Sequence, residues 1–180
     1  MRVDQAVRSL RATRTYAPTP IDDERVGRWV DAARWCGSSK NSQPWRFVAV
    51  RDRESLRRLS GMGDFARHLS TCQLALVLVA APGPYPFSRA FDLGRVAQSL
   101  MLLAHEDGVG SCVAVLEPRA NLIAAGGLVR APEGWSAELA IGFGHPVGEN
   151  ASSGPSPRGR LPTAELLFWE TFPARHDALR

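Results

Sequence analysis

The residue types best suited to chemistry gather in one loop, residues 37–47, which runs directly into an apolar segment. Its hydroxyl and amide groups, which both donate and accept hydrogen bonds, belong to Ser38, Ser39, Asn41 and Gln43. Gly37 has no Cβ and lets the backbone come close to a flat ligand. Pro44 restricts the residue before it, so we expect Gln43 to be extended and the end of the loop to be stiff. The pattern predicts a shelf for a planar cofactor, and the alternative is a simple turn that feeds a strand.

Two pairs of closely spaced arginines are suited to binding the dianionic phosphate of such a cofactor. The pairs lie near opposite ends of the chain, Arg11 with Arg14 and Arg158 with Arg160. For either pair alone, solvated surface arginines are the more ordinary interpretation, because arginine is mostly exposed in folded proteins. The presence of both pairs together with the polar loop favours a shared anion-binding site.

The composition indicates one globular domain. With 180 residues the chain can bury a sizeable core, and 44% of its residues are hydrophobic against 22% charged. The net charge is +4, from 22 basic and 18 acidic residues, yet acidic residues interrupt most of the arginine clusters. We therefore expect no continuous basic surface, which argues against nucleic acid as a partner.

The spacing of cysteine, histidine and apolar residues argues against several other classes of protein. Cys36, Cys72 and Cys112 are too far apart for a zinc motif and too few for a disulfide framework, so we expect reduced thiols and a cytoplasmic location. The four histidines lack metal-ligand spacing, and no metal site is predicted. The longest apolar run, residues 74–81, is too short for a membrane helix, and the N-terminus carries no apolar signal region.

Hydrophobic periodicity predicts a mixture of helices and strands. Helices are expected at residues 4–10, 21–35, 54–59, 91–107 and 118–125, and strands at residues 45–50, 74–80, 111–116 and 137–141. Residues 142–157, rich in glycine, serine and proline, are expected to form a loop. Thr163 is expected to cap a last helix whose apolar residues, Leu166, Leu167 and Trp169, would dock on a neighbouring subunit. The irregular order of elements favours an α+β fold over a run of βαβ units.

Within this framework the polar loop resembles the flavin loop of the nitroreductase-like FMN-dependent oxidoreductase family, whose usual form is P-S-x-x-N-x-Q-P-W-x-F. Gly37 departs from that form, which commonly has proline there. The cofactor-lining residues that the resemblance implies are Gly37, Ser38, Ser39 and Asn41. Residues 108–112 resemble the family's G-[LV]-G-[ST] turn, which leads to a backbone amide that hydrogen-bonds flavin N5. Ala114 and Val115 are the candidates for that amide, and residues 137–144 resemble the family's last core strand.

The arginine pairs also have counterparts in the family. There an N-terminal segment of the form R-x-S-x-[RK] and a C-terminal [KR]-x-R bind the FMN phosphate and ribityl chain. The residues that match these two segments are Arg11, Thr13, Arg14, Arg158 and Arg160. Leu10 and Ala12 stand where the family often has arginine and serine, so two polar contacts are missing at the N-terminal segment.

The resemblance runs from about residue 11 to residue 170 and implies an α+β homodimer with exchanged segments. Each subunit would be a three-layer sandwich with a central mixed sheet flanked by helices. Residues 1–180 would form a single nitroreductase-like domain, of which residues 158–180 pack on the partner subunit. Two FMN molecules would bind at the interface, where Ser38, Ser39 and Asn41 reach across from the partner.

The implied activity is that of an FMN-dependent NAD(P)H oxidoreductase. NADH or NADPH would reduce the flavin, and a small electron-poor acceptor such as a nitro-aromatic or a quinone would then take the electrons in a ping-pong cycle. The flavin would carry the chemistry, so no side chain is predicted to act as acid or base. Two alternatives stay open: a protein that stores or delivers FMN without turnover, and a specialised flavin dehydrogenase of a biosynthetic pathway.

Overall fold

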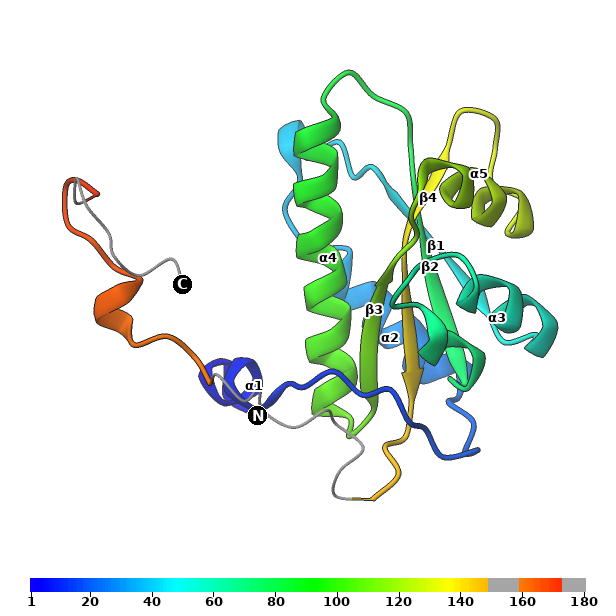
Figure 1. Cartoon of the computed structure of the whole chain (residues 1–180), viewed down its shortest axis with the longest axis horizontal. Coiled ribbons are helices and arrows are strands. Elements are labelled where there is room, and N and C mark those ends of the chain that lie inside the picture. The colour runs from blue at the N-terminus through cyan, green and yellow to red at the C-terminus, as the bar shows by residue number, and fades with distance from the viewer. Residues whose placement is uncertain (149–158, 173–180) are drawn as a thin grey trace.

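The computed structural model describes residues 1–148 and 159–172 and shows a central sheet with helices on both faces (Figure 1). In these residues the α-helices are α1 (Val3–Ser9), α2 (Asp23–Ala33), α3 (Arg53–Ser60), α4 (Pro86–Glu106) and α5 (Arg119–Leu128). The strands are β1 (Trp45–Val50), β2 (Leu74–Ala80), β3 (Gly110–Val115) and β4 (Ser136–Gly144). Three short 3₁₀ turns complete the described elements: η1 (Ser39–Asn41), η2 (Arg67–Ser70) and η3 (Thr163–Glu165).

The sheet has the strand order β1-β2-β4-β3, and each neighbouring pair is antiparallel. The registers place Leu76 opposite Ile141 and Cys112 opposite Gly142. Within the described part of the chain, the single parallel pairing is an isolated bridge between Ala12 and Ser111. The expected mixing of strand directions is therefore limited to that bridge, where the N-terminal segment runs beside β3.

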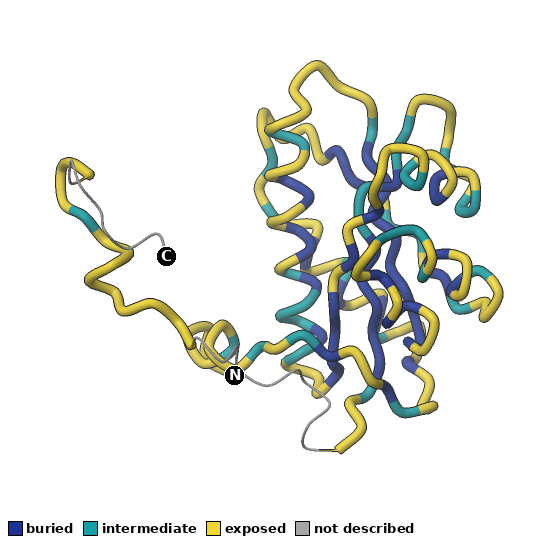
Figure 2. The backbone as a smooth tube through the Cα atoms, in the orientation of Figure 1, coloured by how far each residue is buried: buried dark blue, intermediate teal, exposed yellow. Residues whose placement is uncertain are grey.

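Strand β2 is buried along its whole length and separates two apolar layers. Leu74, Leu76 and Leu78 pack with residues of α2 and α4, while the alternate side chains of β2 pack with residues of α3 and α5. Because successive side chains of a strand point to opposite faces, a run of apolar residues is what a sheet covered on both sides requires. The dark blue strands at the centre of Figure 2 show this burial. The predicted α+β class and three-layer arrangement are confirmed.

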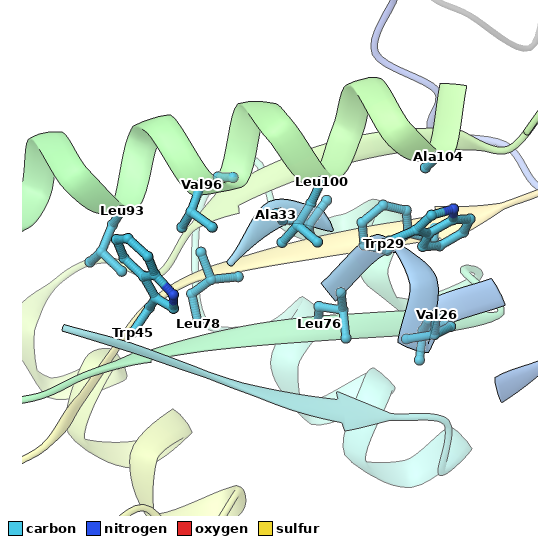
Figure 3. Close-up of a cluster of buried hydrophobic side chains, with 14 of the residues drawn as sticks. Val26, Trp29, Ala33, Trp45, Leu76, Leu78, Leu93, Val96, Leu100 and Ala104 are labelled. Carbon is cyan, nitrogen blue, oxygen red and sulfur yellow. The ribbon is translucent and has the colours of Figure 1, made fainter. Parts of the chain in front are cut away.

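The layer between the sheet and helices α2 and α4 contains the larger aromatic side chains. Figure 3 shows Leu93, Val96 and Leu100 of α4 directed toward the sheet, with Trp45 near Leu93 and Trp29 of α2 at the other end of the cluster, near Ala104. Trp29 lies 5.4 Å from Phe143 between ring centroids, and its indole N–H donates to Asp107 at 2.9 Å. Full burial of each such side chain contributes about 1.5–3 kcal/mol relative to exposure, so this layer holds α4 firmly against the sheet.

The helix starts follow from local chemistry. Asp22 accepts a hydrogen bond from the Arg25 N–H and begins α2, and Asp52 caps α3 through the Ser55 N–H. Helix α4 begins at Pro86, earlier than the predicted residue 91, because proline is favoured in the first helical turn. The apolar pattern could not reveal this first part, since Phe87 is exposed.

Two predictions about the C-terminal third are wrong. Strand β4 continues to Gly144 instead of ending at residue 141, because its pairing with β3 extends to Gly110. The last predicted helix is only the 3₁₀ turn η3, which has no side-chain cap from Pro162 or Thr163. Residues 159–172 instead extend away from the body of the molecule (Figure 1), and Trp169 is 79% exposed. Without a surface to cover, an apolar segment this short gains too little from helix formation.

Candidate functional site

The outer edge of β3 is the first part of the candidate site. The N-terminal segment covers this edge at Ser111, whose carbonyl accepts the Thr13 N–H at 2.9 Å. The Leu116 N–H points the other way and donates to the Glu138 carbonyl of β4 at 3.5 Å. Since backbone groups alternate along a strand, the amide of Val115 points to the outer edge and that of Ala114 toward β4. Val115 is also 51% exposed, whereas Ala114 is 1% exposed. Of the two predicted amides, the Val115 amide is thus the accessible one.

A segment between α3 and β2 lies along the same edge. At its start, a Cβ built on Gly63 would lie 2.5 Å from the Val115 carbonyl oxygen, so only glycine allows this approach. Farther along, His68 Nε2 lies 3.0 Å from the Cys112 carbonyl oxygen. These two contacts hold the segment against β3 at both ends.

Between this segment and the N-terminal segment lies a cleft of about 390 Å³. We call it the edge cleft; it is lined by Arg14, Asp64, Phe65, Arg67, His68 and Thr71. Its lining combines cationic and acidic side chains with the aromatic ring of Phe65. Phe65 is 85% exposed, so its side chain is accessible from solvent. Such a cleft suits a planar ligand with polar groups along one side. Sequence reasoning missed Asp64 and Arg67, since polar residues in a turn carry no motif.

His68 is a buried residue at the base of the edge cleft. Its Nδ1 lies 3.1 Å from the Phe65 carbonyl oxygen, and its Nε2 faces the Cys112 carbonyl oxygen. Burial is the main cause that lowers the His68 pKa, and the nearby charge of Arg14 acts in the same direction, while hydrogen bonds to the two carbonyls raise it. The neutral imidazole has one N–H, so it can donate to one of the two carbonyls at a time.

Arg11 and Arg14 line different cavities although they are close in sequence. Arg11 lines a cavity of about 270 Å³ together with Thr13 and residues 108–110. The Arg11 guanidinium donates to the carbonyls of Arg8 at 2.6 Å and Leu10 at 2.9 Å, so it also caps the end of α1. We call this the N-terminal cavity.

Thr13 serves mainly in packing. It is buried, and a Cβ on Gly110 would lie 2.5 Å from Thr13 Oγ1. The glycine in the turn before β3 therefore leaves room for the N-terminal segment to approach the strand. This explains why the structure needs a small residue in the Gly-Val-Gly-Ser turn.

The polar loop lies against the first half of α4. The Ser39 N–H donates to the carboxylate of Asp92 at 2.9 Å, and Asp92 is 3% exposed. Arg95 Nη1 lies 3.9 Å from Asp92 Oδ1, one turn farther along the helix. A Cβ on Gly37 would lie 2.9 Å from Arg95 Nη2. A side chain at position 37 would therefore have to displace the Arg95 guanidinium, which fills the space beside Gly37.

The backbone of the polar loop is more strained than expected. Lys40, Asn41 and Gln43 have φ values of 52°, 53° and 44°, in the left-handed region that residues other than glycine rarely adopt. The prediction that Gln43 is extended is therefore wrong. The Gln43 N–H donates to Ser38 Oγ at 2.9 Å, and this bond closes the loop. The hydrogen bond and the following β1 together outweigh the local preference set by Pro44.

Within one chain, the polar loop and the N-terminal arginines lie at opposite ends of α4. Ser39 contacts Asp92 near the start of the helix, whereas Ser9 Oγ lies 2.7 Å from His105 Nε2 near its end. At 1.5 Å per residue, these two points on the helix are about 20 Å apart. Arg160 is exposed in the extended segment, and Arg158 lies outside the described residues. A single chain therefore does not unite all the predicted site residues.

Comparisons with known proteins identify the family of this chain. The Nitroreductase family model matches residues 7–63, which include Arg14 and the polar loop. A protein of Archaeoglobus fulgidus named "Putative NADH dehydrogenase/NAD(P)H nitroreductase" is 31% identical over 143 residues, covering 77% of this chain and 82% of that protein. The chain belongs to the nitroreductase family. It is accordingly an oxidoreductase.

Solved structures show the same fold. An FMN-dependent nitroreductase of Clostridium difficile is 23% identical, with a TM-score of 0.79 over 94% of this chain and 100% of the other. NfrA1 of B. megaterium is 21% identical, with a TM-score of 0.83 over 96% of this chain and 76% of the other.

Among residues 1–148 and 159–172, no helix is both long and apolar enough to cross a membrane. In the same residues, no three side chains of histidine, cysteine, aspartate or glutamate come together as a set that could hold a metal ion.

Proposed function

We propose that this chain is an FMN-dependent oxidoreductase that takes electrons from NADH or NADPH and passes them to a small electron-poor acceptor. The observation that carries this proposal is the edge cleft, where Arg14, Asp64 and Arg67 gather. Gly63, which precedes Asp64, lies against the Val115 carbonyl, so the outward amide of Val115 is on the same edge of the sheet. Bound FMN would supply the hydride and electron transfer that no protein side chain can perform.

The donors and acceptors of the edge cleft fit the polar edge of a flavin ring. Arginine side chains donate only, which suits the ring's carbonyl oxygens and unprotonated nitrogens, while the carboxylate of Asp64 accepts from a ring N–H. The Val115 amide would donate to N5, where a backbone donor needs no titration to be available. At the other end of the cofactor, Arg11, Arg158 and Arg160 would bind the phosphate, with Thr13 packed beneath them.

We further propose that the complete site forms between two subunits. The polar loop and the N-terminal arginines of one chain are separated by about 20 Å along α4. The loop would therefore line the cofactor of the partner subunit, through Gly37, Ser38, Ser39 and Asn41. Exposed apolar residues support an interface: Phe87 and Phe91 on α4, and Leu161, Leu166, Leu167, Trp169 and Phe172 in the extended segment. Residues 1–180 would then form one domain whose residues 158–180 pack on the partner.

The protein's role in the cycle would be to bind the cofactor, to orient it, and to leave one face of its ring accessible to the electron donor and acceptor. The donor and the acceptor would occupy the same open face in turn, as a ping-pong cycle requires, and protons would come from solvent. For a nitro-aromatic acceptor, the nitro compound, NAD(P)H and one proton give the nitroso compound, NAD(P)⁺ and water. For a quinone, the same reductant and proton give the hydroquinone.

The first experiment identifies the cofactor and its reduction. Purified protein should be yellow, release FMN on denaturation, and lose its flavin absorbance on anaerobic mixing with NADH or NADPH. Flavin that stays oxidised with both donors would instead indicate a storage or delivery protein. A colourless protein that FMN cannot reconstitute would contradict the proposal altogether.

Variants of the edge cleft locate the cofactor. Arg14→Ala with Arg67→Ala should weaken FMN binding about tenfold or more, because two charge-assisted hydrogen bonds are removed. Arg58→Ala is the matched control, since Arg58 is an exposed arginine on α3 that does not line the edge cleft. Equal FMN affinity in all these proteins would place the cofactor elsewhere.

A further inference from the structure

A third cavity lies between the polar loop and the connection from β2 to α4. Its volume is about 300 Å³. We call it the loop cavity; it is lined by Ser39, Lys40, Ser42 and Pro44 of the loop, by residues 81–85 of the connection, and by Ser88, Arg89 and Asp92 of α4. This volume is at the lower limit for small-molecule sites, which suits one substituted ring better than a dinucleotide.

The walls of the loop cavity are flat and largely apolar. Pro44, Pro82 and Pro84 line it together with the ring of Tyr85. Tyr85 is 59% exposed. Lys40 Nζ lies 5.2 Å from the centroid of this ring, which places an ammonium group beside the aromatic wall.

The other charged groups of the loop cavity are already paired. Arg89 forms an ion pair with Glu138 at 3.1 Å, and its guanidinium also donates to the Ala81 carbonyl at 3.4 Å. Asp92 accepts the Ser39 N–H and faces Arg95. Lys40, the sole lysine of the chain, has no carboxylate within ion-pair distance in residues 1–148 and 159–172. The cavity therefore offers one positive charge that a ligand could neutralise.

The backbone supports a ligand-binding role for this lysine. Lys40 and Asn41 are two consecutive residues in the left-handed region. Conformations of this kind persist where the surrounding structure over-determines them, and they cluster at ligand sites. Here the Ser39–Asp92 and Gln43–Ser38 hydrogen bonds hold the loop on both sides of Lys40.

We infer that the loop cavity binds the electron acceptor and that this acceptor is a small planar anion, such as an aromatic carboxylate or phenolate. Its ring lies against Tyr85 and the prolines, and its negative group lies at Lys40. The inference rests on the proposed function, which puts the neighbouring Ser39 against the partner's cofactor and so brings a ligand of this cavity to the flavin.

A pair of acceptors that differ in charge but little in size tests the inference. For the protein as purified, kcat/KM should be about fivefold higher for 4-nitrobenzoate than for 4-nitrobenzamide, as one partly exposed charge pair allows. Lys40→Gln should remove the preference, so that kcat/KM becomes equal for the two acceptors within about twofold. Lys40→Arg should retain most of the preference, and Arg58→Gln, which removes a positive charge on α3, should retain all of it.

A binding measurement separates recognition from turnover. In calorimetric titrations without electron donor, Lys40→Gln should weaken 4-nitrobenzoate binding about fivefold, and Tyr85→Leu should weaken both ligands. If the wild type reduces both acceptors equally well and Lys40→Gln changes neither rate nor binding, the inference is wrong while the proposed function stands. If the protein holds no flavin, the proposed function fails. If, in addition, 4-nitrobenzoate binds equally well to the wild type and to Lys40→Gln, the inference fails as well.

Discussion

At the residue scale, the absence of one side chain decides how the polar loop meets α4. Gly37 leaves the space that the Arg95 guanidinium fills, and Arg95 in turn lies beside the buried carboxylate that holds Ser39. At this position, which departs from the family pattern, the loop thus contacts a helix that is distant in sequence. Asp92, a buried residue of α4, thereby links the loop to the core of the protein.

Gly37→Ala tests this arrangement. The new Cβ would lie 2.9 Å from Arg95 Nη2, and because the guanidinium is the end of a flexible side chain, we expect it to move. The free energy of unfolding should change by less than about 1 kcal/mol, while FMN affinity should fall about threefold as the loop loses its support. Urea denaturation and flavin titration measure the two effects.

Gly27→Ala is the matched control for that variant. Gly27 lies in α2 with nothing within 4 Å of its Cβ position, so alanine should stabilise the helix by about 0.5–1 kcal/mol. FMN affinity should not change. If Gly37→Ala leaves flavin binding at the wild-type level, the proposed role of the Arg95 contact is wrong.

His68 predicts how stability depends on pH. Its pKa is lowered in the folded protein, chiefly by burial, while the unfolded chain has an ordinary value of about 6.5. Below about pH 6.5 the unfolded state therefore binds more protons than the folded state, and the free energy of unfolding falls as pH falls. His68→Gln keeps an N–H donor but cannot titrate. Its Tm should decrease less than that of the wild type between pH 7.5 and 5.5 in calorimetric scans, and an equal decrease would contradict the prediction.

At the scale of elements, α4 separates two groups of site residues, and the extended C-terminal segment has no place on its own chain. Residues from Leu161 to Phe172 contribute no buried side chain to the described body of the molecule. Since apolar side chains are stabilised by leaving water, their exposure in one chain indicates a covering surface on another. The position of α4 and the exposed C-terminal segment therefore both support the two-subunit site proposed above.

A chain that ends at Arg160 tests the role of this segment. The shortened protein should be monomeric at micromolar concentration by light scattering and should lose most of its FMN, because the interface that completes the site is removed. Its circular dichroism should stay close to that of the full chain.

Point variants provide a control for the truncation. Leu166→Asp with Trp169→Asp in the full chain should also favour the monomer, whereas Ile123→Asp should not, although Ile123 on α5 is equally exposed. A shortened chain that remains a dimer with bound FMN would show that the segment does not form the interface.

At the scale of the whole molecule, one buried strand joins the two helical layers. Strand β2 pairs with both β1 and β4, and its alternate side chains enter both apolar clusters. The residues that line the edge cleft and residues 37–44 of the polar loop lie outside these clusters, on elements that the clusters hold in place. Stability and ligand binding are therefore separable by mutation.

Leu78→Ala should show this separation. Leu78 is fully buried in the layer that includes α2 and α4, so its truncation should lower the free energy of unfolding by about 2–5 kcal/mol. Below the unfolding transition, FMN content per folded molecule should remain near that of the wild type. Val3→Ala, at an exposed position of α1, should change stability by less than about 0.5 kcal/mol in the same urea titration. Loss of FMN without loss of stability in Leu78→Ala would contradict the separation.

Local chemistry in the sequence predicted much of this architecture. The bounds of β1 and β2 match the prediction because apolar, β-branched and aromatic runs of this length form buried strands. The acidic residues 22–24, which suit the positive end of a helix, and the spacing of Val26 and Trp29 likewise indicated α2. The polar loop and the Gly-Val-Gly-Ser turn identified a family before any contact was known, because their residues match the family's motifs in the same order along the chain.

What the sequence by itself determined is therefore the class of fold, the main helices and strands, and the loop on which the proposed function depends. Only the tertiary structure decided that Asp64 and Arg67 join Arg14, that Val115 and not Ala114 presents its amide outward, and that Gln43 is left-handed. The last predicted helix is only the turn η3, because the extended segment covers no surface of its own chain. The earlier start of α4, at Pro86, follows from local chemistry that the apolar pattern did not reveal. The physical reason is that periodicity and capping act within a few residues, whereas convergence at a site depends on packing and strand pairing between segments far apart in the chain.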